Sequence, residues 1–174
     1  SFCGLFVMDL DLFKSINNNY GHAFGDKLLV LVAQRLKSLI RDTDIVARTS
    51  GDNFALFVKD FPCESEAQSI AEKIAEAFSH PFNIDGVTTN CTLSIGISLF
   101  PHDAKSAGSL FNKAEQAMFD AKDNGRNSYS FFTSIMEESA AQALLLKDQL
   151  ELAIKNNELE VAFQPIVSLK TQSI

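Results

Sequence analysis

The sequence predicts an α+β protein, an α–β sandwich whose central, mostly antiparallel sheet is flanked by helices. Three observations lead to this prediction. Residues 2–8 form a continuous apolar run that ends at Asp9, a pattern typical of a strand buried on both faces. Segments with apolar residues at helical spacing alternate along the chain with short strand-like runs. The composition, 46% hydrophobic and 21% charged over 174 residues, is that of a folded globular chain rather than a disordered one.

The first half of the chain adds helices and a hairpin to the opening strand. A short helix is expected over residues 12–18, and Gly21 separates it from a longer amphipathic helix. Residues 44–49 and 54–59 are predicted as strands because the Ser-Gly-Asp-Asn segment between them has the composition of a hairpin turn. An amphipathic helix is expected over residues 64–79.

The second half continues the alternation. Strand-like runs flank Asn90, the second of them at residues 92–100, and helical spacing predicts a helix over residues 106–124. A short strand at residues 128–132 and a long helix at residues 138–156 follow. This order is compatible with a ferredoxin-like palm, whose sheet presents acidic residues to metal and nucleotide phosphate. The fold alone does not establish a function.

Charge and cysteine content limit the classes of partner. The 15 basic and 22 acidic side chains give a net charge of −7, which argues against binding to a nucleic acid polymer. The three cysteines lack metal-ligand spacing and are expected to be reduced thiols in a cytoplasmic protein. No apolar run reaches the roughly 20 residues of a membrane-spanning helix. Because the chain starts without methionine inside an apolar run, we expect an excerpt of a longer protein, whose other regions can carry a membrane anchor.

Acidic residues follow the first strand and occupy the tip of the predicted hairpin. Asp9 and Asp11 lie at the strand exit, and Asp52 lies in the turn. If the first strand lies beside the hairpin, Asp9 and Asp52 converge, and a cation such as Mg²⁺ bound to nucleotide phosphate would offset their repulsion. The alternative interpretation is that these aspartates serve only the local backbone, because acidic residues are common as helix N-caps and in turns.

Two further pairs of polar residues have both a binding and a local interpretation. Asn17 and Asp26 match the hydrogen-bonding groups of guanine, but such residues near helix ends are also common as caps. Lys122 and Arg126 lie on either side of a predicted helix end and are suited to a triphosphate. Basic residues at that position also complement the helix dipole.

Together these residues resemble the GGDEF family of diguanylate cyclases. The resemblance covers residues 1–132, begins after the family's opening segment, and implies a nucleotidyl cyclase-like fold. It rests on separated motifs in the family's order, namely Asp9-Leu10-Asp11-Leu12-Phe13-Lys14-Ser15-Ile16-Asn17, Tyr20-Gly21-His22, Gly25-Asp26, Arg48-Thr49-Ser50-Gly51-Asp52-Asn53-Phe54, Leu93-Ser94-Ile95-Gly96-Ile97 and Ala121-Lys122 with Gly125-Arg126-Asn127.

The tail resembles the beginning of an EAL phosphodiesterase domain. The matching residues are Leu150, Ile154, Glu158-Leu159, Ala162-Phe163-Gln164-Pro165-Ile166-Val167 and Leu169-Lys170-Thr171. The segment that would carry the EAL signature is absent from this sequence. We therefore expect a fragment of a tandem GGDEF–EAL protein, divided into a GGDEF domain (1–133), a connector helix (134–156) and the start of an EAL domain (157–174).

The GGDEF resemblance implies that two GTP molecules, one on each subunit of a homodimer, are joined into cyclic di-GMP with loss of pyrophosphate. By motif, Mg²⁺ or Mn²⁺ would be held by Asp9, the Leu10 carbonyl and Asp52, and Asp52 would accept the proton. The residues implied to bind GTP are Asn17 and Asp26 at the guanine and Lys122 and Arg126 at the triphosphate.

A second nucleotide site is implied by Arg41-Asp42-Thr43-Asp44. The spacing alone allows Arg41 and Asp44 to hold a second guanine and its phosphate, although an exposed ion pair between them is the alternative. The resemblance implies the RxxD inhibitory site of the family, at which the product cyclic di-GMP docks through Arg41 and Asp44.

The signature loop departs from the family pattern. Active members carry Gly-Gly-Asp/Glu-Glu-Phe, whereas this chain has Ser50-Gly51-Asp52-Asn53-Phe54. Ser50 adds a Cβ where the backbone passes close to the nucleotide. Asn53 replaces a carboxylate with a neutral amide, and losing a charge-stabilising or proton-transfer group typically lowers a rate by about 10²–10⁴-fold.

Three functions follow from this departure. The first is a degenerate GGDEF domain that binds GTP and Mg²⁺, has little or no cyclase activity, and regulates the following EAL domain. The second is an active diguanylate cyclase in which Asp52 suffices. The third is a dimerisation scaffold that binds no nucleotide. Retained guanine and triphosphate residues favour the first two over the third, and Asn53 favours the first over the second.

Overall fold

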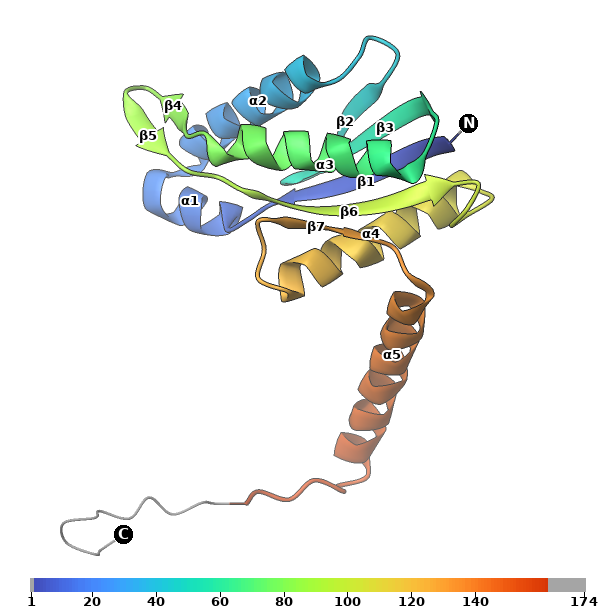
Figure 1. Ribbon diagram of the computed structural model, residues 1–174. Helices are drawn as coiled ribbons and strands as arrows, with labels where there is room; N and C mark the ends of the chain where they lie inside the picture. The colour runs from blue at the N-terminus through green and yellow to red at the C-terminus, as the bar shows by residue number, and fades with distance from the viewer. Residues whose placement is uncertain (1, 163–174) are drawn as a thin grey trace, which may run out of the picture. The chain divides into compact units, whose positions relative to one another are not determined.

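The computed structural model describes residues 2–162 of the chain (Figure 1). Its internal contacts divide the chain into two compact units, Ser1–Glu137 and Glu138–Ile174. Most of the segment that resembles the beginning of an EAL domain, at residues 163–174, lies outside the described residues. Within residues 2–162, no helix combines the length and the apolar character needed to cross a membrane.

The first unit is built on a five-stranded sheet with the strand order β2-β3-β1-β6-β7. β1 (Phe2–Leu10) lies at the centre and pairs antiparallel with β3 (Asn53–Phe61) and with β6 (Leu93–Phe100). β2 (Ile45–Ser50) is antiparallel to β3, and β7 (Ser128–Phe131) is parallel to β6. The predicted fold class, a mostly antiparallel sheet flanked by helices, is confirmed.

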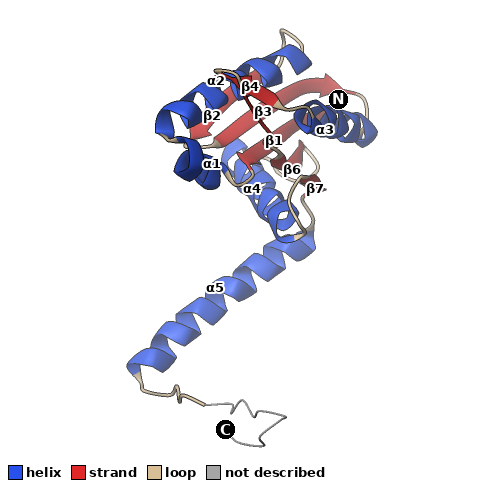
Figure 2. Ribbon diagram, turned by 90° about the vertical axis from the view of Figure 1, so that its left-hand side faces the viewer, coloured by secondary structure: helices blue, strands red, loops and turns tan. Residues whose placement is uncertain are grey.

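Helices cover both faces of this sheet (Figures 1 and 2). α2 (His22–Leu39) and α3 (Glu64–Ser79) pack on one face, and α1 (Phe13–Tyr20) precedes α2 beside the end of β1. α4 (Ala107–Asp123) packs on the opposite face, against β6 and β1. The sheet that carries Asp9 and ends in the β2–β3 hairpin is therefore held between two helical layers.

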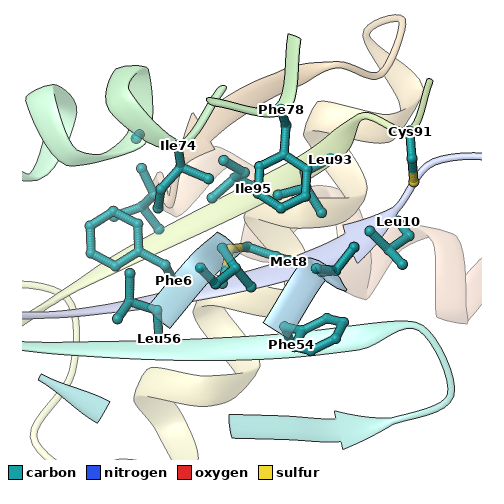
Figure 3. Close-up of a cluster of buried hydrophobic side chains, with 14 of the residues drawn as sticks. Phe6, Met8, Leu10, Phe54, Leu56, Ile74, Phe78, Cys91, Leu93 and Ile95 are labelled. Atoms are coloured by element: carbon teal, nitrogen blue, oxygen red, sulfur yellow. The ribbon is translucent and has the colours of Figure 1, made fainter. Parts of the chain in front are cut away.

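The alternation of side chains along β1 connects these layers. Phe6, Met8 and Leu10 belong to the larger apolar core, which they share with α2 and α3, whereas Val7 packs with Met118 of α4. The continuous apolar run of this strand is explained by burial on both faces. Figure 3 shows the larger core, in which these β1 side chains meet others from the neighbouring strands and from α3, including Phe54, Leu56, Ile74, Phe78, Cys91, Leu93 and Ile95.

Gly96 determines how closely α4 approaches the sheet. A Cβ atom at Gly96 would overlap the carbonyl oxygen of Ala114 and the backbone of Met118. Only glycine permits this contact between β6 and α4. Lys122 lies in the last turn of the same helix, so this close contact also sets how near the helix that carries Lys122 packs to the sheet.

The region before Asn90 differs from the prediction. In place of one strand it contains β4 (Phe82–Ile84) and β5 (Val87–Thr89), which form a separate two-stranded sheet. Asp85 and Gly86 join them with φ angles of 53° and 84°, as a two-residue hairpin turn with positive φ requires. Strands of three residues give too short an alternating pattern to be recognised in the sequence.

The long C-terminal helix, α5 (Ser134–Lys155), covers the residues predicted to connect two domains. Described apolar side chains on it that are largely exposed to solvent include Leu145, Leu146, Leu150 and Ile154.

Candidate functional site

The end of β1 and the tip of the β2–β3 hairpin meet at one edge of the sheet. Asp9 pairs in register with Asn53, and the backbone N–H of Leu10 donates a 3.3 Å hydrogen bond to the carbonyl oxygen of Asp52. Asp52 is half-buried, and its charge raises the pKa of Asp9. The structure thus places Asp9, Leu10 and Asp52, the predicted metal-binding residues, side by side.

Lys122 reaches the same edge from α4. Its Nζ lies 2.7 Å from Oδ1 of Asp9, and the two side chains are 22% and 13% exposed. Burial is the main reason that the pKa of Asp9 lies above its ordinary value of 3.8. The hydrogen bond from Lys122 lowers that pKa, and the charges of Asp52 and Asp11 raise it. In the ligand-free chain, the ammonium group of Lys122 therefore offsets part of the negative charge at this edge.

Asn53 occupies the position where the family pattern has a second acid. Its Oδ1 atom is buried and has no hydrogen-bond partner among the described residues. A buried acceptor without a donor is unfavourable in the free chain. The amide oxygen of Asn53 is therefore available to a ligand, but the amide supplies neither a negative charge nor a group that accepts a proton.

The chemistry of the remaining donors fits one Mg²⁺ ion bound together with nucleotide phosphate. Mg²⁺ in such sites is held by one or two carboxylates and by phosphate oxygens rather than by an all-protein cage. Asp9 and Asp52 are two such carboxylates. Within the described part of the chain, no set of three or more His, Cys, Asp or Glu side chains is arranged to hold a metal ion. Phosphate oxygens would have to complete the coordination.

The loop after α4 presents the second basic residue. α4 ends in a Schellman motif, in which the Arg126 N–H donates to the Ala121 carbonyl (3.1 Å) and the Gly125 N–H to the Lys122 carbonyl (3.4 Å). Gly125 has the positive φ of 111° that this motif requires. Arg126 is exposed and forms no ion pair with any residue in the range 2–162. Its guanidinium group is free to bind an anion.

The predicted guanine-binding residues lie on consecutive helices. Asn17 of α1 has a buried Oδ1 atom without a hydrogen-bond partner among the described residues, and Gly25 of α2 packs directly against that atom. Asp26 follows Gly25 and lines a pocket of about 330 Å³ between α2 and the β2–β3 hairpin, together with Leu29, Val30 and Phe54. An unpaired amide oxygen near a pocket that contains a carboxylate is a suitable arrangement for a purine with N–H donors.

The hairpin turn itself is formed without strain at Ser50. The residue with positive φ is Gly51, at 49°, whereas Ser50 is the last residue of β2. Arg48 holds the turn, because its Nε donates to the Gly51 carbonyl at 2.7 Å. Replacing the first glycine of the signature by Ser50 therefore preserves the backbone of the turn.

Arg41 and Asp44 lie beside a second pocket of about 260 Å³ that is also lined by Glu66, Ser69 and Lys73. An ion pair between Arg41 and Asp44 was the alternative interpretation, and it is wrong. The Arg41 guanidinium pairs with Glu66 at 2.9 Å, whereas the Asp44 carboxylate accepts the backbone N–H groups of Arg41 (3.1 Å) and Lys59 (3.3 Å). Asp44 thus stabilises the backbone of the loop before β2, and the Arg41 guanidinium forms its ion pair with Glu66 instead.

Sequence reasoning missed the role of Asp11. This residue is only 6% exposed, and its carboxylate accepts hydrogen bonds from Thr92, Ser94 and the backbone of Asn127. The sequence gives one signal for it, the second aspartate of the Asp9-Leu10-Asp11 segment. Its partners are far away in sequence and could not be identified without the structure.

A mostly antiparallel palm with clustered acids at the end of its central strand defines the class of nucleotidyl cyclase-like domains. The family described as "Diguanylate cyclase, GGDEF domain" matches residues 1–128, and the chain belongs to this family. The predicted GGDEF assignment is thereby confirmed, and with it a place in cyclic di-GMP signalling.

Relatives and solved structures agree with this assignment. The chain is 38% identical over 168 residues to the cyclic di-GMP phosphodiesterase NbdA of Pseudomonas aeruginosa, covering 95% of the chain and 21% of the relative. It is 40% identical over 160 residues to MucR of the same species, a bifunctional diguanylate cyclase/cyclic di-GMP phosphodiesterase, covering 92% and 23%. The GGDEF domain structure of TpbB from P. aeruginosa superposes with a TM-score of 0.74 at 35% identity, covering 76% of this chain and 83% of that one. The chain spans about a fifth to a quarter of the length of NbdA and MucR.

Proposed function

We propose that this GGDEF domain binds GTP together with Mg²⁺ but forms little or no cyclic di-GMP, and that the bound nucleotide regulates a following EAL phosphodiesterase domain. The observation that carries the proposal is the position of Asn53 opposite Asp9 in an otherwise retained site. The family assignment already establishes that the chain is a GGDEF domain of cyclic di-GMP signalling, and the proposal adds its binding and regulatory roles.

Binding would use polar groups of α1, α2 and the loop after α4, together with Lys122, whose ion pair with Asp9 would open. The buried Oδ1 of Asn17 and the carboxylate of Asp26 would accept hydrogen bonds from the guanine N–H groups. Lys122 and Arg126 would pair with the triphosphate, where charge-assisted hydrogen bonds are about twice as strong as neutral ones. The Asp9–Lys122 ion pair would open, with a cation replacing the ammonium at Asp9.

Catalysis would be impaired because the position of Asn53 lacks a negative charge and a second group, beside Asp52, that could accept a proton. Attack of a 3′-hydroxyl on the α-phosphate of a second GTP requires the hydroxyl proton to be removed and the phosphates to be neutralised. Asp9 and Asp52 would hold the Mg²⁺ ion that, as a Lewis acid, would meet the second requirement. Asp52 and Asp9 can hold one ion, but the neutral Asn53 adds no carboxylate for proton transfer or for a further cation. Ground-state binding is retained because it does not depend on that group.

The place of this chain among its relatives supports the proposed regulation of a neighbouring domain. NbdA carries the name of a phosphodiesterase and MucR that of a bifunctional enzyme, and α5 leads from the GGDEF unit toward the segment that resembles an EAL domain. A ligand can shift an equilibrium between two states of that helix only if it binds one state more tightly. Binding of GTP would order α1, the β2–β3 hairpin and the loop after α4. GTP would then bind more tightly to the state of α5 that is compatible with this ordered site. Cyclic di-GMP at the pocket beside Arg41 would be a second input.

The experiment is an equilibrium binding measurement with a nucleotide comparison. Calorimetry of the purified chain should detect GTP binding in Mg²⁺, with at least about tenfold weaker binding when the cation is removed, and with ATP binding more weakly than GTP because it lacks the guanine donors. In a longer form of the protein that contains the EAL region, the same GTP concentrations should change the rate of cyclic di-GMP hydrolysis. Equal affinities for GTP and ATP, or an unchanged hydrolysis rate at saturating GTP, would contradict the proposal.

A further inference from the structure

Asp11 is a buried carboxylate that has no part in the proposed contacts with GTP. It is 6% exposed, and three donors converge on it. Thr92 Oγ1 lies 2.7 Å from Oδ2, Ser94 Oγ lies 2.7 Å from Oδ1, and the backbone N–H of Asn127 lies 3.0 Å from Oδ2. The backbone N–H of Asp11 also donates to the Thr92 carbonyl at 3.0 Å. All of these bonds cross between segments that are distant in sequence.

The bond to Asn127 reaches the loop that carries Arg126. Arg126 and Asn127 have φ angles of 64° and 47°, so two successive residues other than glycine adopt the left-handed region. Such residues need the surrounding structure to hold them there. The N–H of Arg126 is bound to the Ala121 carbonyl, and the next N–H, that of Asn127, is bound to Asp11. The backbone on both sides of the Arg126 side chain is therefore anchored.

The same carboxylate lies two residues after Asp9. Asp9 pairs in register with Ser94 of β6, and the hydroxyl of Ser94 is one of the donors to Asp11. One buried group thus joins the end of β1, the start of β6 and the loop after α4. These segments carry Asp9 on the cation side of the site and Arg126 on the phosphate side.

We propose that Asp11 is a positioning residue for nucleotide binding, which holds the Arg126 loop at a fixed distance from the Asp9 edge so that one triphosphate with its cation spans both. This inference rests on the proposed function, the binding of GTP. Asp11 does not touch the nucleotide; it acts through the backbone of Asn127. A carboxylate suits this place because both of its oxygens are acceptors, so it can receive all three donors at once and strengthen each bond by its charge.

The variant that tests this role is Asp11→Asn. The amide keeps the size of the side chain but is neutral and carries an NH₂ group in place of one acceptor oxygen. The charge-assisted hydrogen bond from the Asn127 N–H is therefore weakened, even where a hydroxyl turns round to accept from that NH₂ group. At metal sites, removing an outer-shell group that orients a ligand-binding residue typically lowers the affinity by about 10–100-fold, and we expect a loss of the same order here. We expect Asp11→Asn to weaken GTP binding in Mg²⁺ about tenfold and to leave the affinity for guanosine, which has no phosphate, unchanged.

A purely structural role predicts a different pattern. General destabilisation would lower the affinity for GTP and for guanosine alike. The matched control is Ser98→Ala, which removes another buried hydrogen bond of β6, the 2.7 Å bond to the Leu110 carbonyl, at a place that does not contact the Arg126 loop. This control should leave GTP affinity unchanged. Arg126→Ala should weaken GTP binding, and adding Asp11→Asn to it should have little further effect if Asp11 acts through Arg126.

Amide hydrogen exchange gives a second measurement that does not depend on GTP. Asp11→Asn should speed exchange at Asn127 and leave the amides of β1 and β6 protected. If Asp11→Asn does not fold, Thr92→Val and the conservative Thr92→Ser replace it, and only Thr92→Val should weaken GTP binding.

The outcomes separate the two proposals. If the unmodified chain binds no GTP, the proposed function is wrong. If Asp11→Asn also leaves the exchange rate at Asn127 unchanged, the role of Asp11 in holding the Arg126 loop is wrong as well. If the chain binds GTP but Asp11→Asn weakens GTP and guanosine equally, or weakens neither, the positioning role is wrong and the proposed function stands.

Discussion

Asn53 lies directly opposite Asp9 across the β1–β3 pair, with its Oδ1 buried and without a partner among residues 2–162. The family pattern places an acid at this position, where it would face Asp9 and flank Asp52. In this chain the edge of the sheet therefore has two carboxylates, the ammonium of Lys122 and a neutral amide. On the proposed function, this arrangement would keep the groups that bind a nucleotide and would lack one of the groups that help to join two of them.

The first prediction concerns the missing acid. Asn53→Glu, combined with Ser50→Gly, should raise cyclic di-GMP synthesis by about 10²–10⁴-fold because it restores a charge and a proton acceptor. Chromatography of the products formed from GTP and Mg²⁺ measures this directly. Adding Asp52→Ala to the restored chain should abolish synthesis. A restored chain that stays inactive while still binding GTP would show that the defect lies elsewhere.

The second prediction concerns the charge at Asp9. Its pKa is raised chiefly by burial, so the folded chain holds the Asp9 proton more tightly than the unfolded chain. This carboxyl therefore lowers the free energy of unfolding as the pH rises from its ordinary value of 3.8 through its raised value. Asp9→Asn should remove this pH dependence and raise Tm at neutral pH, while Mg²⁺-dependent GTP binding is lost.

Thermal unfolding curves of both chains across this pH window provide the test. Asp85→Asn is a suitable control, since it also removes one aspartate from an ion pair with a lysine, but at an exposed position. Its effect on Tm should be small. A lower Tm for Asp9→Asn at neutral pH would mean that the ion pair with Lys122 outweighs the effect of burial.

The third prediction concerns Asn17. Removing a buried acceptor that has no donor relieves an unfavourable group, so Asn17→Ala should leave the free energy of unfolding unchanged or raise it by up to about 1 kcal/mol. The same change should weaken GTP binding by about 10–100-fold, because a guanine hydrogen bond is lost and the guanine donor is left unpaired. Urea unfolding and calorimetry measure the two effects. Loss of stability together with loss of binding would assign Asn17 to the fold instead of the ligand.

The fourth prediction concerns the pocket beside Arg41. Glu66 occupies the Arg41 guanidinium in the free chain, and the exposed pair is worth at most about 1 kcal/mol. Glu66→Gln should therefore increase the affinity for cyclic di-GMP by up to about fivefold, whereas Arg41→Ala should abolish binding. Glu64→Gln is a matched control on the same helix, outside the residues that line the pocket. Binding that survives Arg41→Ala would place the cyclic dinucleotide at another site.

The fold was predictable because its signals are local and repeated. The apolar run of β1 indicates burial on both faces, and the boundaries of α3 match the prediction because its amphipathic pattern is long. The β4–β5 hairpin was missed because its strands have three residues each. Length thus decided which elements the sequence revealed.

The site was predictable only as far as single residues are recognisable by motif. The partners of those residues are set by tertiary contacts. Asp11 binds the backbone of Asn127, and Arg41 pairs with Glu66, each across a long stretch of chain. No periodicity or spacing relates such residues before the chain folds.

The central claim is that this site binds GTP but does not convert it. The most direct measurement is incubation of the unmodified chain with GTP and Mg²⁺, with GTP affinity measured by calorimetry and cyclic di-GMP measured by chromatography on the same preparation. The account predicts saturable binding and, at most, traces of product. Sustained formation of cyclic di-GMP, or no binding of GTP at all, would contradict it.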